Sequence, residues 1–565
     1  MTVYPGLPDR TIAPGVGFSL NGVQFGPWGS RALANLTPFA SSLAPQVVRF
    51  GLLNLGTIQG WNNSTNAPVL NFSTFDRALA FATLLHASTI LTVPVGTWGD
   101  GNSLPEGMAL NGSAPVSCAY GSGYLATPAA YARLLTPLVQ HMASLGEHVR
   151  YWTIGNEMPL LNSTLVDAYI ADFNAAEKAI HARLPTDLVG SDVMTSKFYL
   201  PTFAAAAQGV GFLSYHFYPA NALTYVGGTY APPNGTGGAF TDAQLWQNGT
   251  DLAHHHTFAA PASAEQSWKN LTGHGLADLD AESNLNAVGG SVSSTPGTDP
   301  RQQTTFAGAW LGASLIDAAT ENVSAFTFFA LAQPAIATPT ATSAYGGWGF
   351  DLVSVSTNGS LVLYAPYYAL RMWSAAIPAG APGLVVTSSD PNLVRAYAVF
   401  TPTGPSLALV SGVNTSLRVI VRVAGGNATW WGGFRIDGNS YVERYDPQTH
   451  STSLVQSGVS VLAPQGVSSS YLVAFNGYGV ATLRMTVTPS WTHANGDRWK
   501  GPVASGDGKG LRGSPVQAGM GIEPAKRPYL AQEVRGLPVC DQRGVREGPS
   551  QRPSSPSRRN DSTNS

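Results

Sequence analysis

Two glutamates in this sequence each stand directly after a short apolar run. Glu157 ends the stretch 151–157 (Y-W-T-I-G-N-E), beside Asn156, and Glu282 ends the stretch 276–282 (L-A-D-L-D-A-E). Burying a carboxyl group is costly unless it is paired or neutralised, so a carboxyl at the end of a buried strand is often functional. Hydrolysis of a glycosidic bond needs two carboxylates, one as general acid/base and one as nucleophile. Taken alone, Glu157 could instead have a structural role, as a cap on the helix that follows.

Other polar residues also end apolar runs. Arg49 stands in V-V-R-F-G, and His216 and Tyr218 stand in S-Y-H-F-Y-P. An Arg or Tyr beside one carboxylate lowers its pKa and keeps it ionised as a nucleophile, whereas apolar neighbours keep a second carboxyl protonated as an acid. The sequence therefore contains the residue types for both halves of such a pair.

Three further features of the sequence bear on the same site. Asp280 precedes Glu282 by two residues, so alternation along a strand would let both face the barrel interior, with a buried hydrogen bond as the more natural role for Asp280. Trp348, in Y-G-G-W, follows the last predicted strand and is expected to stack on a sugar ring. The run 254–256 (H-H-H) lacks the usual spacing of metal ligands, so we expect no metal.

The elements that must position these residues alternate between strand and helix. Eight strands are predicted, each followed by a helix or a long loop, which favours a closed (β/α)8 barrel over residues 1–378. The alternative is an open doubly wound sheet, although no G-x-G-x-x-G follows an early strand. The predicted strands are 16–20, 46–50, 89–95, 149–154, 188–191, 212–217, 277–281 and 325–330. The predicted helices are 72–85, 128–144, 165–183, 200–208, 261–271, 302–320 and 366–373.

The texture of the chain changes after the barrel. Short alternating strands with Gly, Pro and Asn turns predict a β-sandwich over residues 379–487. Residues 488–565 are rich in Gly, Pro, Ser and Arg without periodicity, and they hold 12 of the 30 Lys and Arg residues but 7 of the 32 Asp and Glu residues. We expect this basic tail to be disordered and expect no nucleic-acid partner.

Sequons indicate the compartment. Fourteen Asn residues start an N-x-S/T triplet, an excess that favours a glycosylated, extracellular or cell-surface protein. No signal peptide is visible at the N-terminus, and no run of apolar residues is long enough to predict a membrane span. Charged residues make up 11% of the chain, against about 25% in an average domain. The two cysteines lie far apart and are not expected to pair.

An N-E pair after the fourth strand and a Glu after the seventh resemble clan A of the retaining glycoside hydrolases, which are (β/α)8 barrels. The resemblance implies that Glu157 is the general acid/base and Glu282 the nucleophile. It further implies that Asn156 binds a sugar hydroxyl, that Tyr218 orients Glu282 and that Arg49 supports it. It implies no cofactor.

Within the clan, E-S-N-L-N-A-V-G-G and T-T-F-A-G-A-W-L-G-A-S-L-I-D-A-A look most like family 79, which contains β-glucuronidases and heparanases and carries a C-terminal β-sandwich. The resemblance favours a β-glucuronide substrate, with xylosides, arabinosides and glucosides as alternatives. Two features depart from it: F-G-L-L-N-L-G follows the second strand, and no basic residue is clearly dedicated to a uronate, although Arg301 or Lys197 could serve. The rival from another class is a non-catalytic carbohydrate-binding protein. The oligomeric state is not indicated.

Overall fold

The computed structural model describes residues 1–20, 29–52, 55–96, 104, 108, 115–118, 121–147, 149–156, 163–192, 200–218, 224–226, 229–231, 246, 259–285, 304–334, 351–355, 361–440, 442–446, 451–456 and 458–487. The predicted tail at 488–565 lies outside the described residues.

Eight parallel strands close into a barrel, as the sequence predicted. Each pairs in parallel with the next along the chain, and the last pairs with the first. A lower interior layer of apolar side chains fills the barrel: Val47, Ile90, Phe212, Leu279 and Ala325. The strands are β2 (Gly15–Leu20), β3 (Val47–Gly51), β6 (Ser88–Val93), β9 (Tyr151–Ile154), β10 (Leu188–Asp192), β11 (Val210–Phe217), β14 (Ala277–Ser283) and β15 (Ala325–Phe328).

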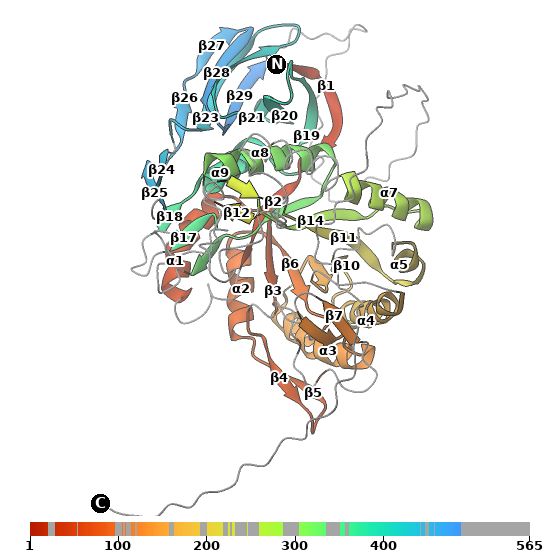
Figure 1. Cartoon of the computed structure of the whole chain (residues 1–565). Helices are drawn as coiled ribbons and strands as arrows, with labels where there is room; N and C mark the ends of the chain where they lie inside the picture. The colour runs from red at the N-terminus through yellow and green to blue at the C-terminus, as the bar shows by residue number, and fades with distance from the viewer. Residues whose placement is uncertain are drawn as a thin grey trace, which may run out of the picture.

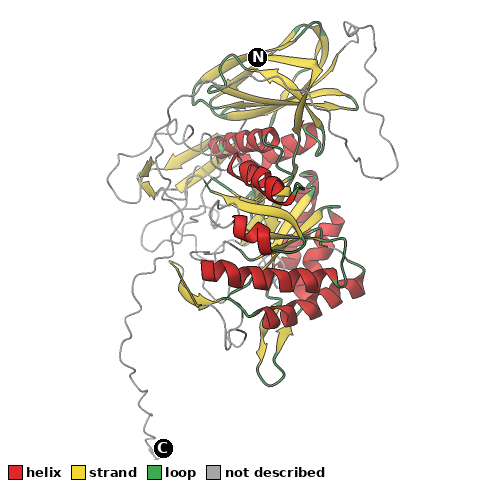
Figure 2. Ribbon diagram, turned by 90° about the vertical axis from the view of Figure 1, so that its right-hand side faces the viewer, coloured by secondary structure: helices red, strands yellow, loops and turns green. Residues whose placement is uncertain are grey.

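Helices surround the barrel (Figures 1 and 2). All seven predicted helices form, with ends shifted by a few residues, while α1, which has Pro38 inside it, was not predicted. The helices are α1 (Gly29–Ser42), α2 (Ser73–Leu84), α3 (Pro128–Leu145), α4 (Ser163–His181), α5 (Leu200–Ala206), α7 (Ala259–Thr272), α8 (Thr305–Thr320) and α9 (Ala365–Ala376). None of the helices described combines the length and hydropathy needed to cross a membrane.

A second, ten-stranded sheet lies at one side of the barrel, at the top of Figure 1. It curls so that side chains from β22 and β28 share an apolar core with those from β21, β23 and β29. Its strands are β1 (Thr2–Ile12), β19 (Pro382–Thr387), β20 (Val394–Thr401), β21 (Gly404–Ser411), β22 (Ser416–Val423), β23 (Ala428–Ile436), β26 (Ser460–Leu462), β27 (Gln465–Ser468), β28 (Ser470–Asn476) and β29 (Gly479–Val487).

The first strand of the chain belongs to this second sheet. We expected residues 1–378 to form the barrel, but β1 pairs with β19 in antiparallel and with β22 in parallel orientation. Pro5 and Pro8 interrupt the alternating pattern by which a strand is recognised. Between Tyr4 and Ile12 the register of β1 shifts twice, which accommodates these residues.

The barrel and the second sheet pack through α8 and α9, which lie between them in Figure 1. Helix α8 is buried on every side, which explains why its sequence is apolar all round. One ion pair also joins the two parts: the Arg395 guanidinium of β20 lies 2.6 Å from the Asp317 carboxylate of α8. Trp373 of α9 stacks on Tyr397 of β20 with ring centroids 6.0 Å apart.

Short ladders extend the loops of both parts. They are β4 (Ile58–Asn62) with β5 (Ala67–Leu70), β7 (Pro115–Cys118) with β8 (Gly121–Tyr124), and β12 (Thr224–Val226) with β13 (Thr229–Ala231). The others are β16 (Ala332–Pro334), β17 (Val353–Val355) and β18 (Leu361–Leu363) in one sheet, and β24 (Val442–Asp446) with β25 (Ser451–Gln456).

The sequons in the described residues all lie on the surface. Eight of the fourteen asparagines are described and each is exposed: Asn35, Asn62, Asn63, Asn71, Asn270, Asn322, Asn414 and Asn427. Glycans at these positions would not disturb the core. Glycosylation and an extracellular location stay predictions.

Candidate active site

A β-bulge near the end of β14 determines where Glu282 points. Asp280 pairs with Tyr215 of β11, whereas Glu282 pairs with the next residue, His216, so that Ala281 has no partner in the ladder. Tyr215 and His216 are consecutive and point to opposite faces of the strand. Glu282 therefore shares the inner face with His216, and Asp280 shares the outer, helix-facing side with Tyr215. Bulges commonly re-aim a side chain in this way next to functional sites.

Arg49 is the centre of the polar cluster at this end of the barrel. It projects from β3, and its guanidinium donates through Nη1 to Glu282 Oε2 and through Nη2 to Asn156 Oδ1 at 2.7 Å. The Arg49 and Glu282 side chains are 6% and 13% exposed. One planar cation thus joins side chains from three strand ends in a largely buried setting, where charge-assisted hydrogen bonds are strong.

Glu282 receives a second donor from Tyr218. The Tyr218 hydroxyl, just beyond β11, donates to Oε1, the carboxylate oxygen that Arg49 does not contact. Both oxygens of Glu282 are therefore held by groups on other strands. A cation and a hydroxyl donor favour the ionised carboxylate, which is the form that a nucleophile needs.

His216 lies between the cation and the carboxylate. Its Nε2 is 3.5 Å from Arg49 Nη2, and its Nδ1 is 3.7 Å from Glu282 Oε2. Because a guanidinium only donates, Nε2 faces it best as an acceptor, which leaves the proton on Nδ1 on the side of Glu282. An imidazole oriented in this way adds a weak favourable contact to the Glu282 carboxylate.

Asn156 follows β9 through a turn that needs glycine. Gly155 has φ of 90°, which residues with a side chain rarely adopt, and its N–H donates to Val93 O at 2.8 Å. The turn carries the Asn156 amide to Arg49, which uses its Oδ1. The Nδ2 group of Asn156 is thereby directed away from the guanidinium and is available to a ligand hydroxyl.

The structure thus brings together five of the seven predicted site residues. Arg49, Asn156, His216, Tyr218 and Glu282 meet at the C-terminal end of the barrel strands, where (β/α)8 barrels carry their active sites. Glu157 and Trp348 lie outside the described residues, so their predicted roles stay predictions.

The expectation that Asp280 could face the barrel interior is wrong, because alternation along the strand is broken at Ala281. Its expected buried hydrogen bond is present: Ser283 Oγ donates to Asp280 Oδ2. Sequence reasoning also missed Thr327 of β15, whose hydroxyl donates to the backbone oxygens of Asp280, at 3.2 Å, and of Ala281. Nothing in the sequence signals this pairing between distant strands.

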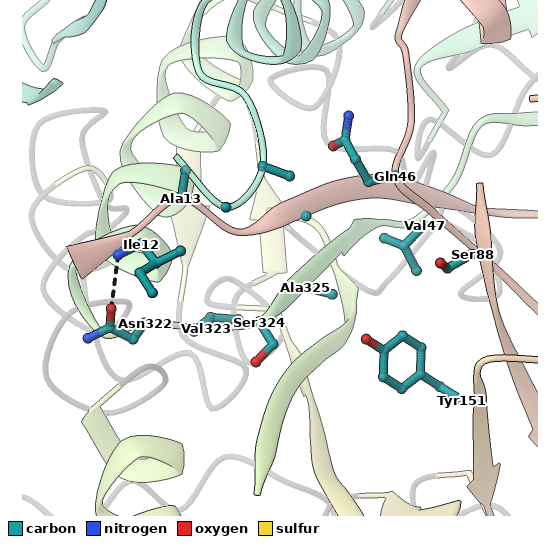
Figure 3. Close-up of a pocket in the computed structure, with 13 residues that line it drawn as sticks. Ile12, Ala13, Gln46, Val47, Ser88, Tyr151, Asn322, Val323, Ser324 and Ala325 are labelled. Carbon is teal, nitrogen blue, oxygen red and sulfur yellow. Dashed lines mark hydrogen bonds between the residues drawn. The ribbon is translucent and has the colours of Figure 1, made fainter. Parts of the chain in front are cut away.

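The opposite, N-terminal end of the barrel holds a cavity of about 470 Å³ (Figure 3). It is lined by neutral residues from the strand starts and from the links to the second sheet, among them Gln46, Ser88, Tyr151 and Ser324. At its edge, Ile12 N donates to Asn322 Oδ1 at 3.0 Å. Among the described residues that line this cavity, none carries a charged side chain. Size alone therefore does not mark a catalytic site here.

Within the described residues, no group of three or more His, Cys, Asp or Glu side chains is arranged to hold a metal ion. The run 254–256 lies outside the described residues.

Comparison with solved structures identifies the same fold. The chain is similar to SrfJ from Salmonella typhimurium (13% identity, 85% of this chain and 91% of that chain, TM-score 0.52). It is also similar to the catalytic domain of GH30 xylanase C from Talaromyces cellulolyticus (14%, 86% and 99%, 0.51) and to a glucosidase from Croceicoccus marinus (14%, 86% and 98%, 0.51). At this identity the likeness shows the shared architecture of barrel and β domain. No protein-family model and no curated protein matches the sequence.

Proposed function

We propose that this protein is a retaining glycoside hydrolase in which Glu282 is the nucleophile. The observation that carries the proposal is the double support of the Glu282 carboxylate, by Arg49 on one oxygen and by Tyr218 on the other. A carboxylate fixed in this way at the C-terminal end of a barrel suits attack on an anomeric carbon. The named activities of the similar structures, a xylanase and a glucosidase, support the same reaction class.

The proposed reaction has two steps. Glu282 attacks the anomeric carbon to form a covalent glycosyl-enzyme, while Glu157 protonates the departing oxygen. Glu157 then removes a proton from the incoming water, and the glycosyl bond to Glu282 breaks with net retention. Retention requires the two carboxyl groups to lie about 5–5.5 Å apart.

The other residues of the cluster have roles that follow from their contacts. Glu282 loses its negative charge when it bonds to the sugar and regains it in the second step. Arg49 and Tyr218 are already placed to stabilise the carboxylate that is released, so they need not move. Asn156 Nδ2 donates to a sugar hydroxyl, because its Oδ1 is occupied by Arg49. His216, on β11, contacts both Arg49 and Glu282 and helps to hold the two side chains in their relative positions.

For the sugar, the sequence resemblance favours a β-glucuronide, and the names of the similar structures, a xylanase and a glucosidase, favour xylosides and glucosides. A uronate carboxylate calls for a cation, and the Arg49 guanidinium is engaged by Glu282 and Asn156. The two other basic candidates, Arg301 and Lys197, lie outside the described residues. All of these sugars therefore belong in the test.

The test is hydrolysis of an aryl glycoside panel with β-glucuronide, β-xyloside, β-glucoside and α-arabinofuranoside. We expect turnover of at least one member, and a loss of more than about 1000-fold in kcat for Glu282→Gln and Glu157→Gln. Glu265→Gln on α7 is the matched control and should keep wild-type activity. Binding of glycans by the wild type and by both variants, without any turnover, would instead make this a carbohydrate-binding protein.

A further inference from the structure

The bulge that aims Glu282 lies against β15 as well as against β11. Between Asp280 and Ser283 the register of β14 with β15 shifts, and the two residues of β14 in that interval stand opposite Thr327 alone. A bulge interrupts the ladder of backbone hydrogen bonds, yet buried backbone oxygens need donors. Position 327 is therefore a place where a side-chain donor can replace a backbone donor.

Thr327 carries such a donor. Its hydroxyl donates to the backbone oxygens of Asp280, at 3.2 Å, and of Ala281, the residue directly before Glu282. Thr327 is fully buried and follows Ala325 of the lower apolar layer by two residues, so alternation places it on the inner face of the barrel. These bonds are therefore made in a low-dielectric interior, where a hydrogen bond is stronger than in water.

Glu282 is thus held at both ends of its side chain. Arg49 and Tyr218 bind the two oxygens of its carboxylate, and Thr327 binds the backbone that leads to its Cα. The contacts at the carboxylate do not by themselves fix the backbone, because a side chain with several rotamers can reach the same partners from more than one backbone position. A misplacement of a reacting group by about 1 Å can lower a rate by about 100-fold.

We propose that Thr327 is a positioning residue that fixes the Glu282 nucleophile through the backbone of residues 280 and 281. The proposal rests on the proposed function, because it concerns the same site. The hydrogen bonds of Thr327 go to backbone oxygens and to no reacting atom. Its loss should therefore slow the chemical step and leave substrate binding largely unchanged.

The chain offers a matched control at Thr92 on β6. Thr92 follows Ile90 of the lower apolar layer by two residues, as Thr327 follows Ala325, and it is 5% exposed. Its hydroxyl, however, has no hydrogen-bond partner among the described residues. Replacement of either threonine by valine nearly keeps the shape of the side chain and removes the hydroxyl. The two substitutions therefore differ in whether a hydrogen bond is lost.

The kinetic test compares these variants on the glycoside that the wild type hydrolyses best. We expect Thr327→Val to lower kcat by about 10- to 100-fold, with KM within about twofold of the wild type. Thr327→Ser keeps the hydroxyl and should hold kcat within about threefold of the wild type, although loss of the buried methyl group lowers its thermal midpoint. Thr92→Val should keep wild-type kcat without a lower thermal midpoint, because it removes a buried hydroxyl that has no partner.

Three kinetic results would overturn the proposal. Wild-type kcat in Thr327→Val would show that the hydroxyl does not position the nucleophile. Equal losses of kcat in Thr327→Val and Thr327→Ser would assign the effect to packing of the methyl group. A loss in Thr92→Val as large as that in Thr327→Val would mean that kcat responds to any such change inside the barrel.

A second measurement does not require turnover. His216 Nδ1 lies 3.7 Å from Glu282 Oε2, so the imidazole resonances of His216 in the NMR spectrum of histidine-labelled protein report a displacement of the carboxylate. They should shift in Thr327→Val and keep their wild-type positions in Thr327→Ser and Thr92→Val. Resonances that do not move in Thr327→Val would refute the positioning role. If the wild type hydrolyses no glycoside, the proposed function fails, and these resonances still decide whether Thr327 positions Glu282.

Discussion

The two ends of one barrel differ in what their side chains can do. At the C-terminal end, Arg49, His216 and Glu282 are nearly buried and converge on one another from three strands. At the N-terminal end, a cavity of about 470 Å³ is lined by neutral side chains and backbone (Figure 3). The end with the described cavity is therefore not the end with the buried charged cluster.

The difference has a physical basis. Desolvating a charge is costly, so a buried cluster of charges persists only if the fold supplies matched partners. In this barrel the inner-facing residues of the lower layer are apolar, as in Ile90 and Leu279, and the polar residues come at the strand ends above them. Stability and catalysis are thus separated along the strand direction.

The largest effect that distinguishes the two ends of the barrel is expected on substitution of Arg49 at the C-terminal end. Lysine keeps the charge but cannot reach Glu282 and Asn156 at once, because it lacks the planar fork of the guanidinium. We expect Arg49→Lys to lower kcat by about 100-fold or more, measured on the best glycoside of the panel.

The matched control is Arg395→Lys, which alters a second largely buried arginine–carboxylate pair, between β20 and α8. It should reduce the thermal midpoint and leave kcat within about twofold. Equal losses of kcat in the two variants would mean that Arg49 supports the fold rather than the reaction.

The smallest effect is expected at the opposite end. Tyr151 lines the N-terminal cavity, where Figure 3 shows its ring, and Tyr151→Phe removes only a hydroxyl. We expect kcat/KM to change by less than about twofold and stability by less than about 1 kcal/mol. A loss of activity above tenfold would show that the two ends are coupled.

Much of this architecture could be predicted because the barrel strands are short apolar runs with polar ends. The runs that end at Arg49, at Asn156 and at Tyr218 identified three strand ends, and a closed barrel brings such ends to one rim. Alternation and turn residues also predicted β20, β21, β22, β23, β28 and β29 of the second sheet, whereas the short strands β26 and β27 were not predicted.

The rest depended on contacts between residues far apart in the sequence. Strand β1 carries prolines and pairs with residues that lie 370 or more positions later, in β19 and β22. The face of Asp280 was predicted wrongly, because strict alternation from Glu282 would place both side chains inside the barrel. Hydrogen bonds from Ser283 to Asp280 and from Thr327 to Ala281 stabilise the bulge at Ala281, and no local sequence pattern predicts it.

The central claim, that Glu282 becomes covalently bonded to the sugar, can be measured directly. The protein is incubated with a fluorinated glycoside of the sugar that the panel identifies, then digested, and the modified peptide is located by mass spectrometry. The account predicts one glycosyl adduct, on Glu282, and none in Glu282→Gln. An adduct on another residue, or rapid turnover of the parent glycoside with inversion and no adduct, would contradict it.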